Sequence, residues 1–130
     1  TIYEQYNIPE DKITFNKKRI AHNDFIAEEY DILLYNLKQI KSLASQRPVY
    51  VFTIAAKYEL HNFYQHPENN KLGPRLKKDL DSLGIHYIDI IGAMKEAYHP
   101  VEYKNLYLEC DGHWSAEGNQ FAAKEIKKHI

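Results

Sequence analysis

The sequence lacks several features that would mark particular classes of protein. Its single cysteine, Cys110, excludes an intrachain disulfide. No apolar run approaches the roughly 20 residues that a membrane-spanning helix needs, so no membrane span is expected. The formal net charge of −1 argues against nucleic acid as the main partner. The glycine-rich phosphate loops of nucleotide-binding proteins are also missing, so no nucleotide cofactor is expected.

Helical and strand patterns alternate along the chain after residue 20. Apolar residues recur every three or four positions where helices are expected, and two short apolar runs are typical of strands buried on both faces. The expected elements are helices over residues 24–45, 74–84 and 116–130, a helical turn over residues 93–98, and strands over residues 49–56 and 85–91.

The residues between these elements predict loops, helix ends and caps. The polar stretch 57–71 is expected to be a long loop. Gly84 is expected to end the second helix in the left-handed conformation, and Gly92 to end the second strand. Asn23 or Asp24 would cap the first helix through its side chain.

The order helix, strand, helix, strand, helix predicts an α/β fold with a mostly parallel sheet covered by helices on both faces. A single domain over residues 1–130 is expected, with residues 1–20 as a lead-in without a clear pattern. Ligands bind such sheets at the carboxyl ends of the strands. The polar stretch after the first strand and the loop before the last helix would therefore share one rim.

The block Asp111-Gly-His-Trp-Ser-Ala-Glu-Gly118 is where the sequence points to chemistry. A carboxylate beside an imidazole fixes the tautomer of the ring and stabilises its protonated form, so the ring can take a proton from a hydroxyl. Asp111 and His113 are therefore a candidate orienter and base. The alternative is that both side chains satisfy backbone groups of a loop. Trp114 is expected to pack beside the site, and Ser115 to cap the last helix.

This block, followed directly by a terminal helix, resembles the last conserved block of the SGNH (GDSL-type) hydrolase superfamily. Its Asp-x-His-Trp form is most similar to the branch of polysaccharide O-acetyltransferases and related esterases. Many members place two residues between Asp and His, where this chain has Cys110, so the role is carried onto Asp111. The resemblance implies a flavodoxin-like three-layer sandwich and a Ser-His-Asp mechanism without a cofactor. The substrate that it implies is an acyl ester, above all an acetyl ester of a carbohydrate.

A second block, Ala21-His-Asn-Asp24, is similar to the Gly-x-Asn-Asp block of the same superfamily, with Ala21 in place of glycine. The resemblance implies that Asn23 serves the oxyanion hole, while its other interpretation is a helix cap. In total the resemblance covers residues 21–130. All the elements expected in that range fall in the order of the family.

The nucleophile of the family is not in this chain, because no Gly-Asp-Ser block follows an apolar strand. The chain has four serines, and none stands in such a setting: Ser42, Ser45, Ser82 and Ser115. The resemblance then implies that the N-terminal strands are missing, which would leave one long edge of the sheet uncovered. Either the chain is a fragment, or an N-terminal segment or second chain supplies the serine, or the protein is a relative without the chemistry.

That last case is a hypothesis from another class, a noncatalytic α/β binding or interaction module. It would use its 11 tyrosines and the exposed sheet edge to bind a partner chain or a glycan. A zinc site is a third hypothesis, with ligands from histidines and aspartates. Neither a close histidine pair on a helix nor a paired-cysteine spacing supports it, so no metal is expected. The side chains that could supply ligands are those of His61, His66, His86, His99, His113, Asp89 and Asp111.

Overall fold

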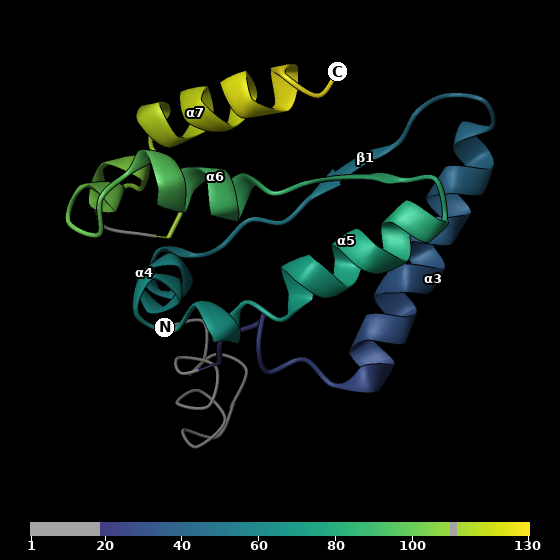
Figure 1. The fold of residues 1–130 in the computed structure, drawn as a ribbon, viewed down its shortest axis with the longest axis horizontal. Helices are drawn as coiled ribbons and strands as arrows, with labels where there is room; N and C mark the ends of the chain where they lie inside the picture. Colours follow the sequence, from purple (N-terminus) through teal and green to yellow (C-terminus); the bar gives the residue numbers. More distant parts are fainter. Residues whose placement is uncertain (1–18, 110–111) are drawn as a thin grey trace, which may run out of the picture.

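The computed structural model describes residues 19–109 and 112–130, which form five α-helices, two 3-10 turns and a two-stranded parallel sheet (Figure 1). The α/β class expected from the sequence is confirmed. The elements are α3 (Ala27–Ala44), β1 (Tyr50–Phe52), α4 (Lys57–Gln65), η1 (Pro67–Asn69), α5 (Leu72–Ser82), β2 (His86–Ile88), α6 (Ile90–Ala97), η2 (Glu102–Leu106) and α7 (Ala116–Lys127).

The two strands pair in parallel, and Val51 lies opposite Tyr87 in the ladder. Side chains that alternate along the strands enter two separate hydrophobic clusters, because successive side chains of a strand point to opposite faces. Tyr50 and Ile88 belong to a cluster with α4, α6 and α7, whereas Val51 and Tyr87 belong to a cluster with α3 and α5. Helices therefore cover both faces of the sheet, as expected, with α6 and α7 on one side and α3 and α5 on the other (Figure 1).

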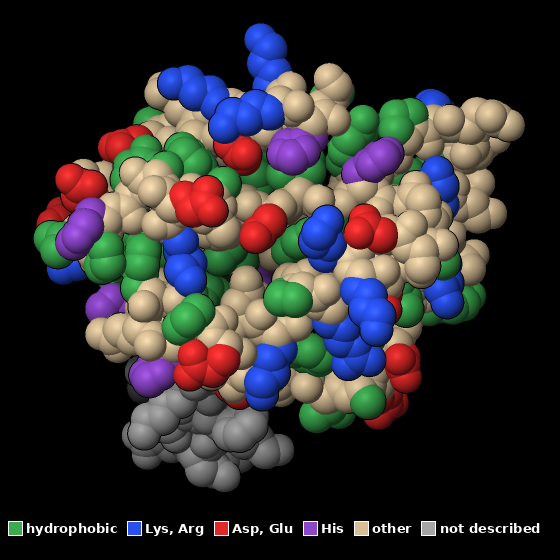
Figure 2. All heavy atoms as spheres, viewed as in Figure 1, with side chains coloured by type: hydrophobic (Ala, Val, Ile, Leu, Met, Phe, Trp, Pro, Cys, Tyr) green, Lys and Arg blue, Asp and Glu red, His purple; other side chains and the backbone are tan. Residues whose placement is uncertain are grey.

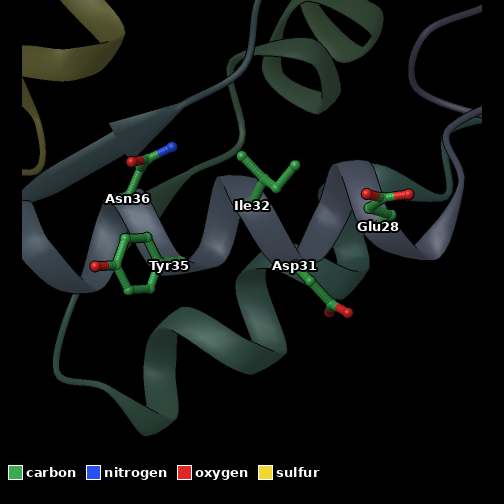
Figure 3. A pocket seen from close by; sticks show the side chains of 5 residues that line it. All are labelled: Glu28, Asp31, Ile32, Tyr35 and Asn36. Carbon is green, nitrogen blue, oxygen red and sulfur yellow. The ribbon is translucent and has the colours of Figure 1, made fainter.

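The first helix, α3, is apolar on two opposite sides. Tyr30 and Leu37 are buried against α5 and the sheet. On the opposite side Ile32 is 57% exposed and Leu43 is 82% exposed. A shallow hollow of about 610 Å³ lies on this outer side, and Figure 3 shows Ile32 and Tyr35 among the side chains that line it. A helix with apolar residues on both sides is typical of one that is covered on both sides.

Strand β1 is shorter than the apolar run that predicts it, 49–56. Only Tyr50–Phe52 pairs, and the chain from residue 53 to residue 56 continues without helix or ladder. Within the described residues β1 pairs with a single strand, β2, and no described strand pairs with its other edge. Ile54, just beyond the ladder, is 55% exposed.

The expectation of a strand over residues 85–91 ending at Gly92 is wrong at its second half. The ladder stops at Ile88, and helix α6 begins at Ile90 because the Asp89 carboxylate accepts a hydrogen bond from the Gly92 N–H at 2.9 Å. Ile90 and Ile91 are buried as helical residues. A short, fully apolar run does not distinguish a buried strand from a buried helix.

The expectation of a loop over residues 57–71 is also wrong, because this stretch contains the nine-residue helix α4 and the turn η1. Leu60 and Phe63 are fully buried at a spacing of three, so α4 packs a narrow apolar stripe beneath a polar surface. The side chain of Glu59 accepts a hydrogen bond from the Ala56 N–H at 3.0 Å and so satisfies a free donor at the start of the helix.

The remaining helices agree with the sequence. Helix α5 begins two residues before Pro74, and Gly84 follows it with a φ of 67°, the left-handed conformation that was expected. Helix α7 begins at Ala116 with Ser115 as its cap. Acidic and basic side chains are interspersed over the face in Figure 2. In the part of the chain that the structure describes, no helix combines the length and apolarity required to cross a membrane.

Candidate functional site

The segment around the candidate base is a closed loop joined to the start of α7. Tyr107 and Trp114 form an antiparallel bridge, and the Leu108 N–H donates to the His113 carbonyl oxygen at 2.9 Å. The backbone is therefore held by these contacts at both ends of the loop, at Leu108 and at His113. His113 is exposed at the end of this loop. Asp111 lies outside the described residues.

The base of the loop is anchored in the core and at the end of β1. Tyr107 is buried, and its hydroxyl donates to the Ala55 carbonyl oxygen at 2.9 Å. Burial raises the pKa of Tyr107 to about 12, so its hydroxyl stays a donor at neutral pH. Trp114 packs against the core cluster, as expected of a side chain that supports the site. The loop with His113 is thus fixed beside the carboxyl end of β1.

Ser115 acts as a helix cap, which confirms the structural role expected for it. Its hydroxyl accepts from the Gly118 N–H at 3.2 Å and donates to the Asn105 carbonyl oxygen at 2.5 Å. The other serines, Ser42, Ser45 and Ser82, are exposed on or beside α3 and α5. None of the four stands at the end of β1 or β2, so the described residues include no serine placed as a nucleophile.

The block that contains Asn23 is a tight turn and not the start of a helix. Both the Asn23 and the Asp24 N–H groups donate to the Ile20 carbonyl oxygen, at 2.9 and 2.8 Å. Neither residue caps α3, whose N-cap is Ile26, so the cap predicted from the sequence is wrong. The Asn23 side-chain amide donates to Asp24 Oδ1 at 2.7 Å. The Asn23 Oδ1 atom is buried and has no partner among the described residues.

A buried histidine–glutamate contact that the sequence did not suggest ties this turn to α4. His22 is 4% exposed and Glu59 is 3% exposed, and His22 Nδ1 lies 3.1 Å from Glu59 Oε1. The same Oε1 atom accepts from the His22 N–H at 3.3 Å, while Oε2 accepts from Ala56. Burial alone would raise the pKa of Glu59, but the hydrogen bonds from His22 and Ala56 lower it. Glu59 therefore holds the turn against the end of β1 as a carboxylate.

These contacts bring the three candidate segments to one place. Glu59 connects the turn of residues 20–24 to Ala56, and a Cβ built on Gly112 would lie 4.0 Å from the Ala56 Cβ. Gly112 is the residue between Asp111 and His113. The turn with Asn23 and the loop with His113 therefore both adjoin the carboxyl end of the β1 run, the rim predicted from the α/β pattern.

A hollow of about 530 Å³ opens beside the loop. Helix α4 lines one wall with Lys57, Tyr58 and His61, and η2 contributes Tyr103 and Lys104. The remaining lining residues are Glu109 and Gly112. Lys57 and Tyr58 directly follow the β1 run, the position from which the sequence predicts residues that line a cleft. The helix that carries them, α4, lies in the stretch that was expected to be a loop.

The side chains on this wall are held by hydrogen bonds. The Tyr103 hydroxyl lies 3.0 Å from His61 Nδ1. The Tyr58 hydroxyl donates to the Arg19 carbonyl oxygen at 3.0 Å and so joins the wall to the turn that precedes α3. The tyrosine positions are therefore fixed by the same elements that carry the candidate site.

The structure gives no group of three or more His, Cys, Asp or Glu side chains that could hold a metal ion, within residues 19–109 and 112–130. His66 instead pairs with Glu68 at the surface, and His86 stacks on Tyr50. Comparisons of the chain with protein families, with curated proteins and with solved structures find no match in any of the three.

Proposed function

We propose that this chain is the C-terminal portion of an SGNH-type serine esterase or O-acyltransferase that acts on acyl esters, acetyl esters of carbohydrates above all. The observation that supports it most is the meeting of two sequence blocks at the end of β1. His22 and Ala56 both bind Glu59, and Gly112 adjoins Ala56. Two blocks about 90 residues apart in the chain thus adjoin the same end of the β1 run, and the second of them also borders the hollow through Gly112.

In the proposed mechanism His113 is the general base. It takes the proton of a serine hydroxyl supplied from outside this chain, and the serine oxygen attacks the acyl carbon of the ester. Asp111 orients the ring and stabilises its imidazolium form. The imidazolium then returns the proton to the departing alcohol, and water or an acceptor hydroxyl releases the acyl group in the second half of the cycle.

Asn23 would stabilise the oxyanion of the tetrahedral intermediate through its side-chain amide. One N–H of that amide is committed to Asp24, which fixes the plane of the amide, and the second N–H remains to donate. One such donor is typically worth about 3 kcal/mol of transition-state stabilisation. The turn that carries Asn23 owes its position to the Glu59 carboxylate.

We also propose that the two strands belong to a wider, flavodoxin-like sheet in a three-layer sandwich. The edge of β1 with no described strand partner and the apolar outer side of α3 are next to each other in sequence, and both need a partner. An N-terminal segment or a second chain that adds strands along this edge would cover both. The same segment would carry the nucleophilic serine to the carboxyl end of β1.

The test is hydrolysis of p-nitrophenyl acetate by the full-length protein. His113→Ala should reduce kcat/KM on the order of 10²-fold or more, because a positioned general base contributes about that much. The matched control is His66→Ala, which removes an exposed histidine that pairs with Glu68 and does not line the hollow. Equal rates for His113→Ala and the parent protein would exclude His113 from the mechanism.

A second candidate is a noncatalytic interaction module, and the uncovered outer side of α3 favours it. In that case the apolar residues would bind a partner chain without any chemistry. The same assay separates the two. A full-length protein that contains a Gly-Asp-Ser block and leaves the ester intact would support the interaction module.

A further inference from the structure

Two lysines face the hollow beside the His113 loop without a carboxylate partner. Lys57 is the first residue of α4, and Lys104 lies on η2. Neither ammonium group takes part in a salt bridge with any of the residues that the structure describes, whereas Lys77 pairs with Asp81 and Lys128 with Glu125. Glu109 is the one carboxylate among the described residues that line the hollow. These described residues therefore carry more positive than negative charge.

The same hollow has an aromatic wall. Tyr58 is 50% exposed on α4, and its hydroxyl bond to the Arg19 carbonyl oxygen fixes the direction of the ring. Tyr103 is held by its bond with His61, and their ring centroids lie 5.8 Å apart. A rigid, half-exposed tyrosine ring offers a flat apolar surface with a polar edge. This surface suits the C–H face of a sugar ring, whose hydroxyl groups bind polar groups around it.

We propose that this hollow binds an acidic sugar unit, a sugar ring that carries a carboxylate or a phosphate group. Lys57 and Lys104 pair with the anionic group, and Tyr58 stacks on the sugar ring. Glu109 accepts hydrogen bonds from sugar hydroxyls. The proposal deepens the proposed function and rests on it for one point, since Gly112 places the bound sugar beside His113.

Two ammonium groups without a salt bridge to residues 19–109 or 112–130 favour an anionic sugar over a neutral one. A neutral sugar would give neither lysine a counter-charge. An anionic group beside an ammonium group is attracted to it more strongly at a protein surface than in bulk water, because the effective dielectric constant is lower. Preference for the acidic sugar is therefore the expected outcome.

The test is titration of the chain with three probes. The amide NMR signals of Tyr58 and Gly112 report binding. The probes are trigalacturonate, glucose 1-phosphate and the neutral sugar maltotriose. Both acidic sugars, or one of them, should bind at least tenfold more tightly than maltotriose, and the better one identifies the anionic group. Equal affinity for maltotriose, or no binding of any probe, would overturn the proposal.

The double variant Lys57→Ala/Lys104→Ala should lose at least tenfold in affinity for the acidic sugar and keep its affinity for maltotriose. The control, Lys77→Ala/Lys128→Ala, removes two lysines that pair elsewhere and should bind as the parent chain does. Unchanged spectra away from the hollow establish that each variant is folded. Unchanged affinity in the first variant would refute the role of the lysines.

Binding needs no nucleophile, so its outcome is independent of the esterase assay. Sugar binding without ester hydrolysis by the full-length protein would contradict the proposed chemistry alone. Ester hydrolysis that depends on His113, without a preference for acidic sugars, would contradict the sugar proposal alone.

Discussion

Gly118→Ala tests the close approach between α7 and η2 on which the position of the His113 loop depends. A Cβ at this position would lie 2.2 Å from the Leu106 carbonyl oxygen and 3.1 Å from the Trp114 Cβ. Carbon and oxygen atoms normally approach to about 3.3 Å, so α7 would have to move by about 1 Å. The Leu106 oxygen cannot give way freely, because it already accepts from the Ser115 N–H at 2.8 Å.

Two effects of opposite sign compete in this variant. Alanine is favoured over glycine inside a helix by about 1 kcal/mol. Overpacking costs about 1–3 kcal/mol, and weakening the bond to the Leu106 oxygen costs about 1 kcal/mol more. The expected net loss in the free energy of unfolding is about 1–3 kcal/mol.

Urea unfolding followed by the fluorescence of Trp114, the one tryptophan, measures this difference. The calibration variant is Ala123→Gly at an exposed position of the same helix, which should cost about 1 kcal/mol through helix propensity alone. If Gly118→Ala were as stable as the parent chain or more stable, the gain from the helix propensity of alanine would exceed the cost of the contact with the Leu106 oxygen. The approach of α7 to η2 would then be looser than described.

Three further variants test other contacts. Glu59→Gln should cost about 1–3 kcal/mol, because the amide cannot accept from every donor that the carboxylate binds. Since the folded pKa of Glu59 is lowered, its contribution is complete above pH 4.5, the ordinary pKa, and is lost as the pH falls through the folded pKa. Urea unfolding at pH 7 and pH 3 should show the difference in the free energy of unfolding between the two proteins becoming smaller in acid; a constant difference would contradict the role of the Glu59 carboxylate. Tyr30→Phe removes the hydroxyl that donates to Asp79 at 2.6 Å. Burial and the Asp79 carboxylate raise the pKa of Tyr30 to about 12, and burial raises the pKa of Tyr107 to the same value, so the variant should show a smaller absorbance step near pH 12 that leaves the share of Tyr107. A loss of absorbance near pH 10 instead would show that the pKa of Tyr30 is not raised. Gly84→Ala should lower the free energy of unfolding by about 1 kcal/mol because of the positive φ, and an unchanged thermal midpoint would argue against that conformation.

The sequence predicted helices well where one periodic stripe is long. Helix α3 and helix α7 were placed within three residues of their observed ends, because apolar spacing is a local signal and, for α7, so is the cap Ser115. The prediction of secondary structure from the sequence is wrong where residues distant in the chain determine which side chains are buried. Ile90 and Ile91 read as strand, since a run of apolar residues does not indicate which backbone its neighbours impose.

The part of the candidate site that could be predicted consists of residues that are adjacent in the sequence. The Asp-x-His-Trp block drew attention to the loop before α7, and the α/β pattern placed that loop at the end of β1. The His22–Glu59 pair was missed, because the two residues are 37 positions apart and neither belongs to a recognisable spacing. A buried glutamate at the start of a polar helix has no signature that distinguishes it from an exposed one.

The bridge between Tyr107 and Trp114 closes the loop before α7 begins. The conformation of the loop is therefore independent of the helix that follows. The chain leaves and re-enters the core at one point, with the Leu108 N–H bound to the His113 carbonyl oxygen. Residues could be inserted or removed between these two anchors without shifting the register of α7. A change in the number of residues between these two anchors would therefore leave the start of α7 in place.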